Sequence, residues 1–585
     1  MSDRARLGMS DRARLGMSDR ARLGMSDRAR LGMSARARLG MVAVLALVWS
    51  AWRVDLLGDG IVNGGGWSAF GNFWAAIVDP DLTAEFLRLT WDASLTTIAF
   101  AALGTAVALA IGILGAPILS TRLWPSRAGR AMGALAAGAF AVPRGVHEIV
   151  WAIVLMQVFG FDPWVAIVAI GVPFGAVTAK VFAETIDEAD PAAYDALRAL
   201  GASRRTALLT ATAPEIRGEL VSYGFYRLEC AVRSAAVVGI IGVGGIGFQL
   251  DLSFETLRYG EIWTLLAALV VISGLADAWS TAVRRSTGAN AVRVRRWSLA
   301  VGAIVLVASW QRVGLRPSAW WDERTRRLGG EALTDLLPPT LGPGGFDELW
   351  TATIDTLAMS ILALAIAAVL GVALGAAAAA PPAATGRRRR GDRVRRRIGR
   401  LVLRAAMLLV RAVPAPIWAF VAVLVLFPGA VPGAVALGVY NAGVIGRLVS
   451  EVLEERPGEP FHLALDSGAG RIATFVTVRL PDAAGRIVAL LMYRWEVIVR
   501  ETVVVGVVGA GGLGQLLNEH RAARDFDAVT GTILAMIGLA VVVDAASRLI
   551  RRSIGRPAAP SANPTRSLTA AIERRRRVGR IVSAS

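Results

Sequence analysis

The sequence predicts an all-α integral membrane protein with about twelve transmembrane helices, arranged as two parallel six-helix repeats. Hydrophobic residues make up 55% of the 585 residues, and the mean hydropathy is +0.53, which is above the usual range of soluble domains. Many apolar windows approach or exceed the roughly 20 residues that a helix needs to cross a bilayer core. A long segment of the first half also recurs in the second half.

The predicted spans are apolar windows that alternate with charged loops. They cover residues 41–57, 92–119, 131–158, 163–183, 216–246, 261–283, 297–313, 350–379, 401–427, 431–453, 483–515 and 528–549. Arginine-rich segments lie at 284–296 and 387–400 and near the end of the chain, whereas 53–91 and 515–527 are acidic. The positive-inside rule therefore places the basic loops and both termini in the cytoplasm.

Charge and cysteine usage exclude several functions. The net charge of +19 follows membrane topology, and no nucleic-acid motif accompanies it, so no nucleic-acid partner is expected. The single cysteine, Cys230, cannot form an internal disulfide. The three histidines, His147, His462 and His520, are scattered without metal-ligand spacing, so no metal site is expected.

The chain divides into four parts. At the start, MSDRARLG occurs four times and is followed by MSARARLG. This repeat contains no signal-peptide core and fits neither a heptad nor a solenoid, so we interpret residues 1–40 as a disordered basic extension. The first six-span unit is expected over 41–285 (core 90–283), the second over 286–552 (core 350–549), and a basic cytoplasmic tail over 553–585.

The internal repeat is extensive. YRLECAVRSAAVVGIIGVGGIGFQL at 226–250 returns as YRWEVIVRETVVVGVVGAGGLGQLL at 493–517, and one offset also relates Pro214 to Pro481 and Lys180 to Arg447. Because each half holds an even number of predicted spans, the two copies have the same orientation and are related by an axis along the membrane normal. We interpret the chain as a fused dimer of a six-span unit.

A cytoplasmic segment follows the fourth span of each half. The sequences YDALRALGASRRTALLTATAPEI (194–216) and HLALDSGAGRIATFVTVRLPDAA (462–484) each predict a helix, a glycine turn, a short helix and a proline at the start of the next span. Each resembles the EAA loop of bacterial ABC importer permeases, which have the MetI-like fold. The matching positions are Asp195, Ala196, Leu197, Gly201 and Pro214, then Gly468, Leu480 and Pro481, with His462 where the acidic residue is expected.

Within that superfamily, the pattern YRxExxVR…GxxGxGGxG most resembles the permeases of phosphonate importers, in both halves from about residue 90 onward. The resemblance implies an inner-membrane permease that is not an enzyme and that works by alternating access. It implies as partners two copies of an ATPase subunit, an extracytoplasmic binding protein and a small oxyanion. Lys180, the one lysine, lacks the glycine-rich cradle of a Walker lysine, so ATP and Mg²⁺ are expected on the ATPase and no cofactor in this chain.

The repeated motif places charges inside the membrane. Glu229 and Arg233 are i,i+4 neighbours on one helix face, and Glu496 and Arg500 repeat them. Glu229 lies roughly 22 Å along the helix from Pro214, at a depth where a charge costs a few kcal/mol unless it is paired or hydrated.

Two interpretations of these charges stay open. Each pair neutralises itself and holds helices together, or Arg233 and Arg500 donate to an oxyanion in the substrate pathway, with Arg227 and Arg494 as alternative donors. Both interpretations can hold at once. Ser234 and Glu501 occupy equivalent positions, so the pathway is expected to be asymmetric.

The glycines after each charged motif predict close helix packing and a gate hinge in preference to direct ligand contact. They are Gly242, Gly244, Gly245 and Gly247 in the first copy and Gly509, Gly511, Gly512 and Gly514 in the second. Two alternative functions remain. An ABC permease for an amino acid or a quaternary amine would not need paired membrane arginines, and a secondary transporter would not need the paired cytoplasmic loops.

Overall fold

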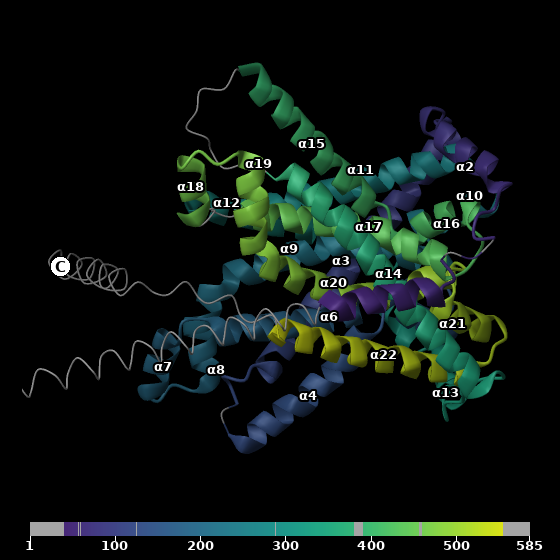
Figure 1. Ribbon diagram of the computed structural model, residues 1–585. Coiled ribbons are helices and arrows are strands. Elements are labelled where there is room, and N and C mark those ends of the chain that lie inside the picture. Colours follow the sequence, from purple (N-terminus) through teal and green to yellow (C-terminus); the bar gives the residue numbers. More distant parts are fainter. Residues whose placement is uncertain are drawn as a thin grey trace, which may run out of the picture. The chain divides into compact units, whose positions relative to one another are not determined.

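The computed structural model describes residues 40–553, except 57, 59, 125, 287, 380–389 and 455–458. The expected extension before Gly40, the tail from residue 554 and part of the basic run at 387–400 therefore lie outside the described residues. The described chain forms two compact units, one of residues 46–454 with 493–544, and a smaller one that includes 459–492 and 545–553. Apart from an isolated bridge between Val62 and Leu426, the regular structure of the described residues is helical (Figure 1).

The longer helices of the first half follow the predicted windows, and shorter helices lie between them. They are Gly40–Arg53, α2 (Gly66–Ala75), α3 (Ala84–Leu119), α4 (Arg127–Gly145), α5 (Glu148–Phe159), α6 (Pro163–Glu188), α7 (Pro191–Ala199), α8 (Arg204–Ala207), α9 (Ala213–Val238), α10 (Ile246–Glu255) and α11 (Tyr259–Arg285). Polar residues at Ncap fix several starts, since Thr83, Ser126 and Asp162 each accept a hydrogen bond from a backbone N–H of the first turn.

The second half repeats this order. Its helices are α12 (Gly288–Val313), α13 (Glu323–Asp335), α14 (Gly345–Ala378), α15 (Arg390–Ala412), α16 (Ala415–Val425), α17 (Ala430–Glu454), α18 (Glu459–Asp466), α19 (Arg471–Thr474), α20 (Leu480–Val507), α21 (Gly512–Ala522) and α22 (Phe526–Ser553).

Among the described residues, six helices are long and apolar enough to cross a membrane, and four further helix pairs qualify if each bent pair is one span. The single helices are α3, α6, α11, α14, α17 and α22. The bent pairs are α4 with α5 (88°), α9 with α10 (56°), α15 with α16 (90°) and α20 with α21 (42°). These ten elements coincide with ten of the twelve predicted windows. The all-α membrane fold with repeated helix order is therefore confirmed.

The remaining windows, 41–57 and 297–313, also form helices but are not among these candidate spans. Gly40–Arg53 is short, and arginines flank the apolar run of α12. Nevertheless α12 packs along α3, with Arg295 beside Gly218 at the start of α9 and Arg312 paired with Asp92 near the start of α3. The helix therefore lies along α3, between the start of α9 and Asp92, despite its short apolar run.

The internal repeat is visible in individual contacts. The backbone N–H of Ile246 donates to Thr97 Oγ1 at 2.9 Å, and its counterpart Leu513 donates to Thr356 Oγ1 at 2.8 Å. Each bond satisfies a donor at the start of the helix that follows the glycine break. Likewise, Trp151 Nε1 donates to the Pro143 carbonyl and Trp418 Nε1 to the Val410 carbonyl, across the bends before α5 and α16.

Candidate functional site

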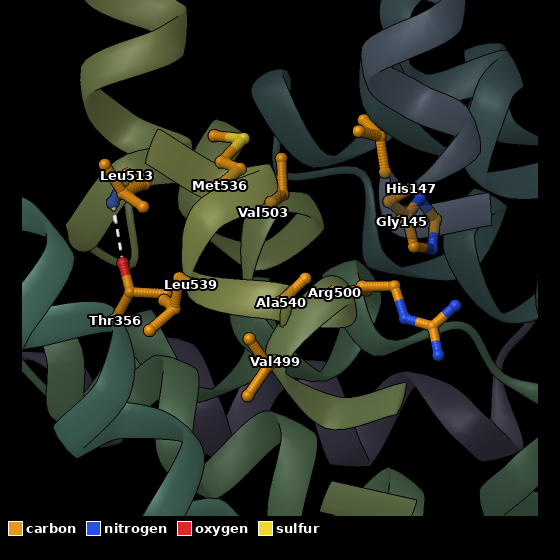
Figure 2. A pocket seen from close by; sticks show the side chains of 11 residues that line it. Gly145, His147, Thr356, Val499, Arg500, Val503, Leu513, Met536, Leu539 and Ala540 are labelled. Atoms are coloured by element: carbon orange, nitrogen blue, oxygen red, sulfur yellow. Dashed lines mark hydrogen bonds between the residues drawn. The ribbon is translucent and has the colours of Figure 1, made fainter. Parts of the chain in front are cut away.

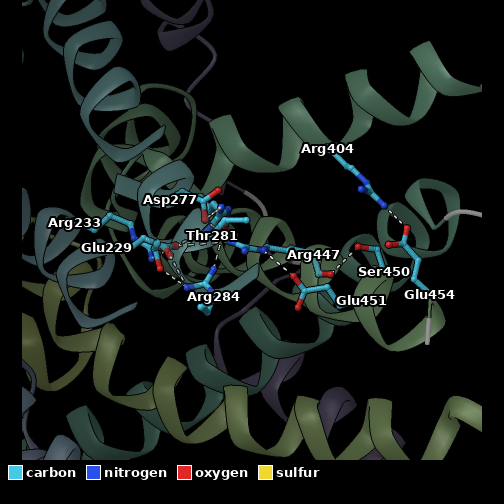
Figure 3. A network of polar contacts seen from close by, with 12 residues as sticks. Glu229, Arg233, Asp277, Thr281, Arg284, Arg404, Arg447, Ser450, Glu451 and Glu454 are labelled. Carbon is cyan, nitrogen blue, oxygen red and sulfur yellow. Dashed lines mark hydrogen bonds and ion pairs between the residues drawn. The ribbon is translucent and has the colours of Figure 1, made fainter. Parts of the chain in front are cut away.

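A cluster of charged side chains lies where helices of the first half meet helices of the second. Its centre is Glu229 on α9, which is 3% exposed. Arg233 Nη2 lies 3.3 Å from Glu229 Oε1, one turn along the same helix, and Arg284 Nη1 from α11 lies 3.8 Å from Oε2. Figure 3 shows these side chains converging on the carboxylate.

Two arginines of the second half complete the cluster. Arg411, at the end of α15, lies 3.2 Å from Glu229 through Nη1 and 3.2 Å from Asp277 through Nη2. Arg447 on α17 lies 2.8 Å from Asp277 and 3.8 Å from Glu229. Both arginines therefore bridge the two carboxylates of the first half. We call these six side chains the arginine cluster: Glu229, Asp277, Arg233, Arg284, Arg411 and Arg447.

Positive charge is in excess in this cluster. Four guanidinium groups face two carboxylates, and within the described part of the chain one further carboxylate, Glu451, reaches Arg447 (3.1 Å) from an exposed position. Removing such charges from water is costly unless their partners satisfy them. An anion that carried the missing negative charge would be bound by preorganised donors.

A small cavity of about 10 Å³ adjoins the arginine cluster, and Glu229, Arg233, Ser273 and Arg411 help to line it. Within the described residues, the buried atoms Glu229 Oε2 and Ser273 Oγ have no hydrogen-bond partner. This volume has room for about one water molecule. The site is thus closed to anything larger in this conformation, but it already holds polar groups that a small ligand or water would satisfy.

A second cavity of about 10 Å³ lies at the repeat-related position (Figure 2). Its lining includes Arg500, Gly145 and Ala540, the counterparts of Arg233, Ala412 and Ser273 in the first cavity. Arg500 donates through Nη1 to the Arg144 carbonyl at 2.7 Å and through Nε to the Glu496 carbonyl at 3.0 Å. The two copies therefore build related cavities with different surroundings, one facing carboxylates and one facing backbone carbonyls.

The alternative donors named from the sequence lie in separate contacts. Arg227 donates through Nε to the Tyr223 hydroxyl at 2.8 Å, and its guanidinium lies 5.1 Å from the Phe174 ring centroid. Arg494 bonds to Asn441 Oδ1 (Nε, 3.0 Å) and lies 3.4 Å from Glu501 Oε1. Arg227 thus bonds within α9 and contacts α6, and Arg494 bonds to α17, so the arginine cluster brings together Glu229 and Arg233 but neither Arg227 nor Arg494.

Position 234 and its repeat counterpart, Glu501, differ in partner as well as in charge. Ser234 Oγ donates to the buried carboxylate of Glu148 at the start of α5. Glu501 Oε2 instead accepts from Asn441 Nδ2 of α17 at 2.8 Å. A carboxylate is thus present at both places. It belongs to Glu148 on α5 in the first half and to Glu501 on α20 in the second.

The two segments expected to couple to an ATPase have the same backbone conformation. In the first, α7 contains Asp195 and Ala196, Gly201 takes a φ of 86°, and Pro214 lies in the first turn of α9. In the second, α18 contains His462, Gly468 takes a φ of 89°, and Pro481 follows the first residue of α20. The His462 side chain is not among those that the structure describes. The expectation that it differs from an acidic residue in this segment therefore stays a prediction.

The glycines named from the sequence form the bends after α9 and α20. Gly242, Gly244 and Gly245 have positive φ, as do Gly509, Gly511 and Gly512. Gly247 and Gly514 instead permit close packing, since an added Cβ would lie 1.8 Å from the Ala236 carbonyl oxygen and 2.4 Å from the Val503 carbonyl oxygen, respectively.

Sequence reasoning missed Asp277, Arg284 and Arg411 as site residues and used Arg447 only to align the repeat. Three of the four stand inside predicted spans: Asp277 in 261–283, Arg411 in 401–427 and Arg447 in 431–453. An ionisable residue inside a span is a functional candidate by default, and that signal was available. Among the described residues, no group of three or more His, Cys, Asp or Glu side chains could hold a metal ion.

Comparison with known families shows to which family the chain belongs. The family described as "binding-protein-dependent transport system inner membrane component" matches residues 108–287 and again 371–556. The chain belongs to this family. It is therefore a multi-pass inner-membrane permease with the family domain present twice, which confirms the tandem arrangement expected from the internal repeat.

The chain is also similar to individual proteins. The permease is 27% identical over 516 residues to the phosphate-import permease protein PhnE of Mycolicibacterium smegmatis, covering 86% of this chain and 92% of that protein. It is 29% identical over 189 residues to the phosphite transport system permease protein PtxC of Stutzerimonas stutzeri, covering 32% of this chain and 68% of that protein. A chain of the MetNI methionine ABC transporter, solved in inward-facing conformations, matches 34% of this chain at 22% identity with a TM-score of 0.30.

Proposed function

We propose that this permease is the membrane subunit of an ATP-driven importer for a small phosphorus oxyanion such as phosphate, phosphite or a phosphonate. The observation that carries the proposal is the excess of arginine over carboxylate in the arginine cluster. An oxyanion matches guanidinium groups in bidentate fashion, whereas a neutral amino acid or a quaternary amine has no use for that excess. Relatives named for phosphate import and phosphite transport support the same class of substrate.

In this proposal the arginine cluster forms part of the substrate pathway. Arg411 and Arg447 of the second half bridge Glu229 and Asp277 of the first half, so these contacts hold the halves together when no substrate is present. An arriving oxyanion takes the place of a carboxylate beside the arginines, and the halves then separate. Arg500 beside the second cavity offers a repeat-related contact further along the pathway, and the bends after α9 and α20 supply the gate.

The remaining parts of the importer are separate chains in this proposal. Two copies of an ATPase bind ATP and Mg²⁺ and dock on the coupling segments 194–214 and 462–481. An extracytoplasmic binding protein delivers the substrate to the other side. The permease units extend over 41–285 and 286–552, both termini are cytoplasmic, and the chain itself carries no cofactor.

Reconstitution of the complete importer tests this function. Vesicles would contain the permease, its candidate ATPase and its candidate binding protein, and ATP hydrolysis would be measured with phosphate, phosphite, a phosphonate and a neutral amino acid. We expect stimulation by at least one phosphorus oxyanion and none by the amino acid. The stimulation should be lost in Arg233→Ala while the subunits still co-purify. Stimulation by the amino acid alone would overturn the substrate class.

A further inference from the structure

The amino-terminal part of α15 has a basic amphipathic surface that the transport proposal does not use. Its described side chains from Val394 to Arg404 are mostly exposed, and Figure 1 shows α15 extending beyond α11 and α17 at its Arg390 end. Only the later part of the helix contributes to the arginine cluster, since Arg411 lies in its last turn.

Apolar residues form one face of this segment. Val394, Ile398, Leu401 and Val402 follow the i, i+4, i+7, i+8 spacing of a single helical stripe, and Leu409 continues the stripe at i+15. Each is between 51% and 61% exposed, so the rest of the permease does not cover the stripe. In water such a stripe would be unfavourable, which indicates that a nonpolar medium covers it.

Arginines form the other face. Arg397, Arg400 and Arg404 are spaced at i, i+3 and i+7, which places them together and away from the apolar stripe, whereas Arg395 lies on the opposite border of the stripe. Arg404 pairs with Glu454, the last residue of α17. An apolar stripe beside a row of arginines is the pattern of a helix that lies at a membrane surface and attracts acidic headgroups.

We propose that residues 394–404 of α15 lie in the cytoplasmic lipid interface and bind the headgroups of acidic phospholipids. Charge complementarity selects this occupant, because zwitterionic headgroups offer the arginines no net negative charge. The cytoplasmic side follows from the topology in the proposed function. Because the same helix ends in Arg411, the lipid contact also helps to fix the position of the arginine cluster, and that consequence rests on the proposed function.

A fluorescence measurement on the full-length chain tests the lipid contact without requiring transport. Ile398→Cys in a Cys230→Ala background would carry an environment-sensitive label. The chain would be placed in nanodiscs of phosphatidylcholine alone or of three parts phosphatidylcholine to one part phosphatidylglycerol, each with a shallow lipid-borne quencher. We expect clearly stronger quenching with phosphatidylglycerol, and we expect high salt to weaken the difference through screening.

Two triple variants make the test specific. Arg395→Gln with Arg397→Gln and Arg400→Gln should remove more than half of the phosphatidylglycerol-dependent quenching. The matched variant on α13, Arg324→Gln with Arg326→Gln and Arg327→Gln, removes the same charge and should leave the quenching unchanged. Equal quenching in both lipid compositions would overturn headgroup binding, and so would absence of quenching in both. If the α15 variant does not fold, the salt dependence of the unsubstituted arginines still decides the question.

Discussion

Replacing Glu229 by Gln is expected to destabilise the permease by about 3–5 kcal/mol, the loss typical of breaking a buried ion pair. The side chain keeps its shape but loses its charge, and Arg233, Arg411 and Arg447 then face one another with Asp277 as their main counterion. The measurement is the midpoint of thermal unfolding of the purified chain in detergent. We expect it to fall by several degrees, and substrate-stimulated ATP hydrolysis to fall with it.

A surface carboxylate supplies the matched control. Glu184 lies 3.8 Å from Lys180 on α6, and its side chain is 59% exposed. Exposed i,i+4 pairs contribute at most about 1 kcal/mol, so Glu184→Gln should leave the unfolding midpoint nearly unchanged. Equal effects of Glu229→Gln and Glu184→Gln would show that the arginine cluster does not hold the helices together.

Replacing Gly247 by Ala is expected to cost about 3 kcal/mol or more, at the upper end of overpacking effects. The added Cβ would lie 1.8 Å from the carbonyl oxygen of Ala236 on α9, and a backbone atom cannot turn aside as a flexible side chain can. The start of α10 would have to move, and with it the Ile246 N–H that donates to Thr97. Both the unfolding midpoint and the yield of monodisperse protein should fall.

Gly274→Ala on α11 is the corresponding control, because an added Cβ there would meet nothing within 4 Å. Alanine has a higher helix propensity than glycine, so this variant should be neutral or slightly more stable. An unchanged unfolding midpoint in Gly247→Ala would contradict the close packing of α10 on α9.

Much of the fold is predictable because it depends on local patterns. Hydropathy located the apolar windows, and the repeated motif related the two halves, since both signals are contained within short segments. The behaviour of α12 was less predictable, because arginines shorten its apolar run and its position depends on contacts with α3 and with the start of α9. Residues 297–313 therefore form a helix that runs along the bundle without meeting the composition expected of a span.

The site was only partly predictable for a related reason. The i,i+4 spacing placed Glu229 beside Arg233 on one helix, but no local pattern connects Glu229 with Arg411 or Asp277 with Arg447. Those pairs are distant in sequence and come together only when α15 packs on α11 and the side chains of Arg411 and Arg447 reach across from the second half. The internal repeat predicts which positions are equivalent but not which partners they contact. Arg500 bonds to backbone carbonyls, whereas its counterpart Arg233 lies beside a carboxylate.

The central claim is that the arginine cluster conducts a phosphorus oxyanion, and tracer uptake tests it most directly. Radiolabelled phosphate, phosphite and phosphonate uptake would be measured in vesicles containing the complete importer, with the unchanged permease or with Arg411→Lys. Lysine keeps the charge but loses the planar fork that binds an oxyanion in bidentate fashion. We predict ATP-dependent uptake by the unchanged permease and at least about tenfold slower uptake by an assembled Arg411→Lys variant, which corresponds to about 1.4 kcal/mol. Equal uptake by the two permeases would contradict the claim.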